Sequence, residues 1–216
     1  MNLTISIAVI LLVILVALVV AWRHVARRRP LPCPVWLSPL LENPYIDTVA
    51  GSAVLLDRAK VGPGMQVLDA GCGPGRVTVP AAKRVGPAGE VVALDLQPGM
   101  LARLRERADS AQVTNIRQIL GGLGRGLVEK DLFDRALLVT VLGEIPENER
   151  SAALQEIYDS LKPGGILSIT EVFPDPHYQN RTKVVQLCER KGFRLEAEYG
   201  SWLAFTINFV KQPSFQ

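Results

Sequence analysis

The chain begins with an unbroken apolar stretch. Residues 3–22 contain no charged side chain and consist mostly of Ile, Leu, Val and Ala. At about 1.5 Å per residue, a helix of this length is roughly 30 Å long, which matches the hydrocarbon core of a bilayer. No basic residue precedes the stretch, although a cleaved signal peptide carries its positive charge first. The pattern therefore predicts a retained transmembrane helix over residues 1–22.

A basic and proline-rich segment follows at residues 23–44. Its arginines come directly after the apolar stretch, and the positive-inside rule then places residues 23–216 in the cytoplasm. Five prolines between Pro30 and Pro44 exclude regular helix and central strand. We interpret the segment as a connector that lies close to anionic lipid headgroups, which would attract Arg23, Arg27, Arg28 and Arg29.

From residue 45 onward, short apolar runs alternate with amphipathic segments. This alternation predicts strands at residues 65–69, 91–95, 115–120, 134–142, 165–173, 193–199 and 203–211, and helices at 45–59, 76–85, 98–109, 147–161 and 181–191. The order favours one α/β domain over residues 45–216, with a mostly parallel sheet covered on both faces. The last two strands are joined by a short turn and must pair antiparallel. The helix at 45–59 either covers a ligand or only packs on the sheet.

A glycine-rich turn follows the first of these strands. Gly71, Gly73 and Gly75 lie between the strand at 65–69 and the next helix, and Asp95 ends the second strand. Glycines let the backbone approach a ligand closely, and a helix N-terminus presents unpaired N–H groups. A nucleoside fits between these two features, with its ribose hydroxyls on Asp95.

Charge and cysteine content narrow the possible partners. The net charge is +3, but residues 30–216 hold 20 basic and 21 acidic side chains, a net of −1. A near-neutral domain lacks the excess of basic residues that is typical of nucleic-acid binding. Three cysteines without metal-ligand spacing suit a reducing compartment, and no metal site is expected.

Four motifs together resemble a known family. They are Asp69–Gly75 (DAGCGPG), Asp95, Val141–Pro146 (VLGEIP) and Leu161–Leu167 (LKPGGIL). In this order and spacing, over about residues 50–211, the chain resembles class I S-adenosylmethionine-dependent methyltransferases. The resemblance implies a Rossmann-like, seven-stranded, mostly parallel sheet with a terminal antiparallel strand. It also implies that the cofactor lies over the carboxyl ends of the first two strands.

The resemblance further implies roles for particular residues. Asp69 would position the methionine amino group, the glycines would contact the amino-acid tail, and Asp95 would bind the ribose. The family often has an acidic residue after the third strand, where this chain has Gly122. Either adenine is then held by backbone and apolar contacts alone, or Leu123 packs against it, or the alignment is shifted by a residue or two. The cofactor-binding set expected from the resemblance is Asp69, Gly71, Cys72, Gly73, Gly75, Asp95, Leu96, Gly122 and Leu123.

The methyl acceptor is less well defined by sequence. The sequence shows no obvious general base. Candidates for contacting the acceptor are Glu144, His177 and Tyr45. A membrane tether raises the effective concentration of membrane-dissolved molecules, which favours a lipid or quinone-like acceptor. The alternatives are a non-catalytic membrane scaffold on a degenerate methyltransferase fold and, less favoured, a nicotinamide-dependent dehydrogenase.

Overall fold

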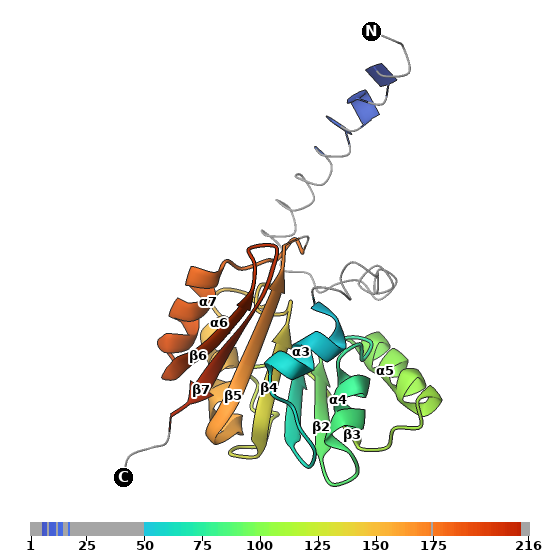
Figure 1. Cartoon of the computed structure of the whole chain (residues 1–216), viewed down its shortest axis with the longest axis vertical. Helices are drawn as coiled ribbons and strands as arrows, with labels where there is room; N and C mark the ends of the chain where they lie inside the picture. Colours follow the sequence, from blue (N-terminus) through green and yellow to red (C-terminus); the bar gives the residue numbers. More distant parts are fainter. Residues whose placement is uncertain are drawn as a thin grey trace.

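The computed structural model describes residues 50–173 and 175–212, together with residues 6–7, 9–11, 13–14 and 17. One sheet of seven strands, in the order β3-β2-β1-β4-β5-β7-β6, forms the centre of the domain (Figure 1). The strands are β1 (Gln66–Ala70), β2 (Glu90–Asp95), β3 (Ile116–Leu120), β4 (Phe133–Val139), β5 (Leu161–Val172), β6 (Phe193–Gly200) and β7 (Ala204–Lys211). Only β7 runs antiparallel to its neighbours, β5 and β6, which confirms the predicted terminal pair.

Helices cover both faces of the sheet. They are α3 (Ser52–Arg58), α4 (Thr78–Val85), α5 (Pro98–Ser110), α6 (Arg150–Ser160) and α7 (Arg181–Glu189). Buried residues of α3, α4 and α5 pack with one face, and those of α6 and α7 pack with the other. On the second face the loop after β3 adds Leu123 and Val128 to the core. Strands buried on both faces explain the near-continuous apolar runs in the sequence.

Strand β4 ends earlier than its apolar pattern predicts. The pattern runs on to Leu142, whereas the strand stops at Val139. Thr140 adopts a left-handed conformation with φ of 57°, and its N–H donates to the carbonyl of Thr170 at 2.8 Å. The next residues therefore turn over the edge of the sheet. Their apolar side chains pack against the glycine turn and the core instead of extending the strand.

Helix α3 packs on the sheet, whereas the rest of the predicted helix before β1 is only partly described. Leu55 and Leu56 are buried in the core on the sheet face, and Asn208 of β7 donates to the Arg58 carbonyl at 2.7 Å. Residues Ser52–Arg58 thus pack on the sheet. Residues 45–49, including the candidate Tyr45, lie outside the described residues.

The predicted membrane anchor cannot be followed through the structure. In the described part of the chain, no helix is long and apolar enough to cross a membrane. Most of residues 1–22 and all of residues 23–44 lie outside the described residues. The anchor and the connector therefore stay predictions.

Candidate functional site

The glycine turn wraps around the end of β2. The N–H groups of Gly71 and Cys72 both donate to the carbonyl of Leu94, at 2.8 and 3.0 Å. Gly71, Gly73 and Gly75 all have positive φ, between +52° and +85°. This is the left-handed region in which side-chain-bearing residues are strained.

The three glycines differ in what surrounds them. A Cβ on Gly71 would lie 2.4 Å from Val141 Cγ2, and one on Gly75 would lie 2.4 Å from Leu104 Cδ1. A Cβ on Gly73 would meet no atom within 4 Å. Packing within the protein thus accounts for Gly71 and Gly75, whereas Gly73 borders open space where a ligand can touch the backbone.

Asp95 faces this turn. Its Oδ2 accepts the Gly73 N–H at 2.8 Å, and its Oδ1 accepts the Gln97 N–H at 2.8 Å. Burial raises the pKa of this carboxyl above its ordinary value, and the backbone N–H groups of Gln97, Gly73 and Leu96 oppose that shift. Each carboxylate oxygen can accept more than one hydrogen bond, so both retain capacity for the hydroxyls of a ribose.

Exposed leucines flank Asp95 on the side where adenine is expected. Leu96 is 60% exposed at the end of β2, and Leu120, which pairs with Asp95 in the register of β2 and β3, is 58% exposed. A Cβ on Gly122 would meet only Leu96 Cδ1, at 3.8 Å. These side chains offer an apolar surface to a flat aromatic base.

Leu123, which the resemblance placed near the cofactor, is buried in the structure. Its side chain is buried in the core beneath the sheet face and does not join the exposed surface formed by Leu96 and Leu120. The sequence missed Leu120, and its position as the last residue of β3, level with Asp95, is the signal that identifies it.

Glu156 organises the loop after β3, where the family's usual acid is absent. This α6 side chain accepts hydrogen bonds from four backbone N–H groups, those of Gly124, Arg125, Leu127 and Val128. The loop is therefore held by a carboxylate that comes from a distant part of the sequence. The pattern around residue 156, an ordinary helical glutamate, gave no sign of this role.

Asp69 is buried below the turn and does not face the surface. The Thr78 hydroxyl donates to its Oδ2 at 2.6 Å, which ties the end of β1 to the start of α4. Burial raises the pKa of Asp69 to about 6, and the charge of Asp95 adds to the shift. Its predicted contact with the cofactor amino group, through water, stays a prediction.

Cys72 is buried within the turn, and its expected contact with the cofactor stays a prediction. Burial is the largest cause that raises the pKa of its thiol, and the carboxylates of Asp69 and Asp95 raise it further. A thiol that stays protonated is a poor nucleophile.

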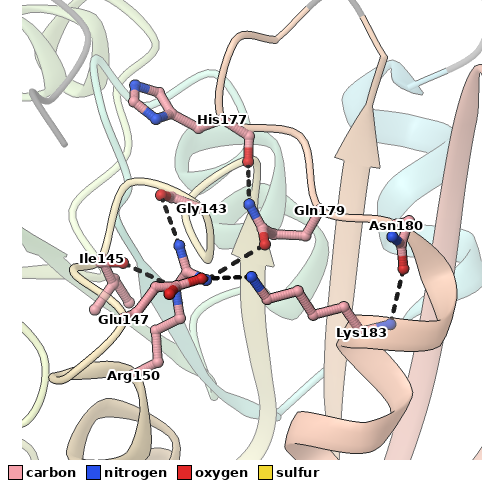
Figure 2. A network of polar contacts seen from close by, with 8 residues as sticks. All are labelled: Gly143, Ile145, Glu147, Arg150, His177, Gln179, Asn180 and Lys183. Carbon is pink, nitrogen blue, oxygen red and sulfur yellow. Dashed lines mark hydrogen bonds and ion pairs between the residues drawn. The ribbon is translucent and has the colours of Figure 1, made fainter. Parts of the chain in front are cut away.

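The loops after β4 and β5 meet at the same edge of the sheet. A Cβ on Gly143 would lie 1.8 Å from the His177 carbonyl oxygen, so only glycine permits this contact. Arg150 fastens the contact from α6, as Figure 2 shows: it donates to the carbonyls of Ile145 and Gly143, at 2.9 and 3.1 Å, and to the Gln179 side chain at 3.3 Å.

The two described acceptor candidates belong to these loops. Glu144 follows β4, and its N–H donates to the Val141 carbonyl at 2.9 Å. His177 follows β5, and in Figure 2 its ring points away from the Arg150 network. Both follow strands that end at the same edge of the sheet, and their contact with an acceptor stays a prediction. The sequence missed Arg150 and the buried Glu171, which both join this region.

The fold and the site define a nucleoside-binding α/β domain. The carboxyl ends of β1 and β2 carry a glycine turn and a ribose-type acid, at the edge where open parallel sheets bind ligands. Among the described residues, no cluster of His, Cys, Asp or Glu side chains has the arrangement of a metal site.

Comparison with known proteins identifies the class. A protein-family profile described as "Methyltransferase domain" matches residues 67–165. Arsenite methyltransferase from Halobacterium salinarum is 33% identical over 122 residues, which cover 54% of this chain and 31% of that protein. Demethylmenaquinone methyltransferase from a Geobacillus species is 31% identical over 110 residues, which cover 51% of this chain and 46% of that protein.

A solved structure shares the fold. The crystal structure of a SAM-dependent methyltransferase from Aquifex aeolicus matches with a TM-score of 0.74 and 20% identity, over 82% of this chain and 98% of that chain. The chain thus contains a class I S-adenosylmethionine-dependent methyltransferase domain. It spans only about a third to a half of the length of the two curated relatives, so the likeness establishes the class of domain and not the reaction of either relative.

Proposed function

We propose that this protein is a membrane-anchored methyltransferase. It transfers the methyl group of S-adenosylmethionine to a small lipid or quinone-like acceptor by direct in-line displacement, with its catalytic domain on the cytoplasmic side. The proposal rests on the hydrogen bond between Gly73 and Asp95 at the predicted cofactor site. The Gly73 N–H donates to Asp95 Oδ2 at 2.8 Å, and no atom lies within 4 Å of the position that a Gly73 Cβ would occupy.

The residues of the site have distinct roles in this proposal. When bound, S-adenosylmethionine supplies a reactive methyl group on a sulfonium. Asp95 holds the ribose, the backbone around Gly73 receives the amino-acid tail, and the exposed Leu96 and Leu120 pack against adenine. Such a site accelerates the reaction mainly through proximity, orientation and exclusion of water.

The acceptor class rests on the N-terminal stretch. Within its described residues, the large apolar side chains are about half exposed or more, namely Ile7, Val9, Ile10, Leu11, Val13 and Ile14. Several exposed apolar side chains close together in the chain favour contact with a membrane or a partner. One relative, by its name, methylates demethylmenaquinone, a quinone, which agrees with a membrane-dissolved acceptor.

Binding of S-adenosylhomocysteine to the full chain in detergent tests the cofactor site. Hydrogen bonds to charged groups contribute about 1.5–3 kcal/mol, so Asp95→Asn is expected to weaken binding by roughly 10- to 100-fold. Asp57→Asn, on the exposed end of α3, is the matched control and should bind like the wild type. Equal affinity of the Asp95 variant and the wild type would contradict the assignment.

A second assay tests the acceptor class. The full chain is incubated with labelled S-adenosylmethionine and a lipid extract of the host, and methylated products are sought by mass. A lipid or quinone product supports the proposal. If the protein does not bind the cofactor even at millimolar concentration, the scaffold alternative is favoured instead.

A further inference from the structure

Glu171 is a buried carboxyl at the carboxyl end of β5. Only 1% of the surface of this residue is exposed. Oε2 accepts the Gln179 N–H at 3.1 Å, whereas Oε1 has no hydrogen-bond partner among the described residues. Buried polar atoms are almost always paired, so an unpaired carboxyl oxygen inside the domain calls for an explanation.

Charged and titratable groups surround this carboxyl on several elements. Asp175 faces it from the loop after β5, Glu144 from the loop after β4, Arg150 from α6, and the phenol of Tyr178 also lies nearby. Burial is the main reason that the pKa of Glu171 rises to about 8, and the two carboxylates oppose its ionisation, while Arg150 and the Gln179 N–H favour it. The group therefore exchanges its proton close to physiological pH.

A cavity of about 290 Å³ lies between the loops after β4 and β5 and the start of α7. Gln179 connects this cavity to the buried carboxyl, because it both lines the cavity and donates its N–H to Glu171. Figure 2 shows Arg150, Gln179 and Lys183 converging here. The loop after β4 also reaches the cofactor side, where Val141 packs against Gly71. The loop after β4 therefore contacts the glycine turn through Val141 and lines the cavity through Gly143.

We propose that Oε1 of Glu171 is the acid–base atom of methyl transfer: it binds the O–H or N–H of the acceptor and takes the proton that this group loses. In the balanced step, the acceptor atom forms a bond to the methyl carbon, the sulfur–methyl bond breaks, and the sulfonium becomes a neutral thioether. The proton of the acceptor then passes to Oε1. This inference rests on the proposed function and names a residue for the acceptor half of that site.

A purely structural role explains only one of the two oxygens. Receiving the Gln179 N–H requires a single acceptor atom, and a glutamine would supply it without burying an ionisable group. The second oxygen is accounted for when an acceptor donates to it. A base is most effective when its pKa lies near the working pH, which holds for this carboxyl.

The test compares Glu171→Gln with the wild type, as full chains in detergent, across pH 6 to 9.5. Glu196→Gln on edge strand β6, where the carboxylate pairs with Lys60 at 2.9 Å, is the matched control. Methyl transfer to the lipid extract and affinity for S-adenosylhomocysteine are measured. Because the base must be ionised, the wild-type rate should rise about tenfold per pH unit and level off above about 8.

The Glu171→Gln variant should lose at least 100-fold of the rate together with this pH dependence, while its cofactor affinity stays within twofold of wild type. The control should keep both. Glu171→Asp, which retains a shorter carboxyl, should recover part of the activity and guards against a folding defect. Equal rates in wild type and Glu171→Gln, or equal losses of rate and of cofactor affinity, would overturn the proposal.

An infrared measurement needs no acceptor. At pH 7 the wild type should show the carbonyl stretch of a neutral carboxylic acid that Glu171→Gln lacks and Glu196→Gln retains. If no such band is lost, Glu171 is ionised at pH 7, and the wild-type rate should then be level from pH 7 upward. A rate that still rises up to pH 8 in that case would assign the proton transfer to another group and overturn the proposal, while the cofactor assignment stands. A lipid extract that yields no product overturns both this proposal and the lipid acceptor.

Discussion

At the scale of single residues, similar side chains do different work because of their surroundings. Asp95 is the last residue of β2 and Asp69 the next-to-last residue of β1, but Asp69 is held by the Thr78 hydroxyl inside the domain and Asp95 faces the glycine turn. Glycines of the turn divide in the same way. Gly71 and Gly75 are required by neighbouring side chains, whereas Gly73 adjoins open space.

Two variants test whether glycine is required by close packing at Gly71 and by space for a ligand at Gly73. Gly71→Ala combines φ of +76° with a Cβ 2.4 Å from Val141, so it should lower the free energy of unfolding by about 2–4 kcal/mol. Gly73→Ala has φ of +52° and no atom within 4 Å, so it should cost only about 1 kcal/mol. The added methyl group of Gly73→Ala enters the cofactor space.

Urea unfolding and S-adenosylhomocysteine binding check this pair. The Gly73 variant should remain folded and bind at least tenfold more weakly than wild type. Equal affinity to wild type at Gly73, or a larger loss of stability at Gly73 than at Gly71, would contradict the division.

At the scale of elements, the site depends on loops that are fastened by distant helices. Helix α6 supplies Glu156 to the loop after β3 and Arg150 to the loops after β4 and β5. One helix therefore positions the adenine side and the acceptor side of the domain together. The loop after β3 follows the exposed Leu120, and the loops after β4 and β5 line the cavity.

Replacing Glu156 should loosen the loop after β3. Glu156→Ala removes the acceptor of four backbone N–H groups, of which those of Gly124 and Val128 are part-buried. We expect a loss of about 1–3 kcal/mol in stability and a weakened affinity for S-adenosylhomocysteine. Hydrogen exchange of the amides of residues 124–128 should accelerate. Gln155→Ala, which removes an exposed side chain that donates to Asp159 at 2.9 Å, is the control. Unchanged exchange in the Glu156 variant would count against this role.

At the scale of the whole molecule, the chain combines a near-neutral α/β domain with an apolar and basic N-terminal segment. Residues 30–216 carry a net charge of −1, and the four arginines just before them carry +4. In the proposed arrangement the segment keeps the acceptor side of the domain near its membrane-dissolved substrate.

Two lysines in the apolar stretch should weaken membrane association. Each charge at the centre of a membrane helix costs about 2.5–3.5 kcal/mol, so Leu11→Lys with Ile14→Lys should shift the protein out of the carbonate-resistant membrane fraction. The control, Leu11→Ala with Ile14→Ala, should remain there. Retention of the lysine variant in the membrane, or release of the wild type, would remove the basis of the lipid-acceptor proposal.

Much of the fold follows from local pattern, because parallel strands buried on both faces are apolar throughout and glycines mark the turn between β1 and α4. The sequence alone therefore determined the α/β class, the terminal antiparallel pair, and the facing positions of the glycine turn and Asp95. Where the pattern was misleading, as at the end of β4, a single left-handed residue, Thr140, redirected an apolar run into packing.

The tertiary structure decided what no local pattern encodes. Leu123 is buried and Leu120 exposed because the loop after β3 folds over the core, and Glu156 holds that loop from 28 to 32 residues away in the chain. Among the described residues, only the folded chain likewise shows that one oxygen of Glu171 accepts the Gln179 N–H and the other has no partner. Burial and hydrogen-bond pairing depend on contacts between distant segments, and only the folded chain brings those segments together.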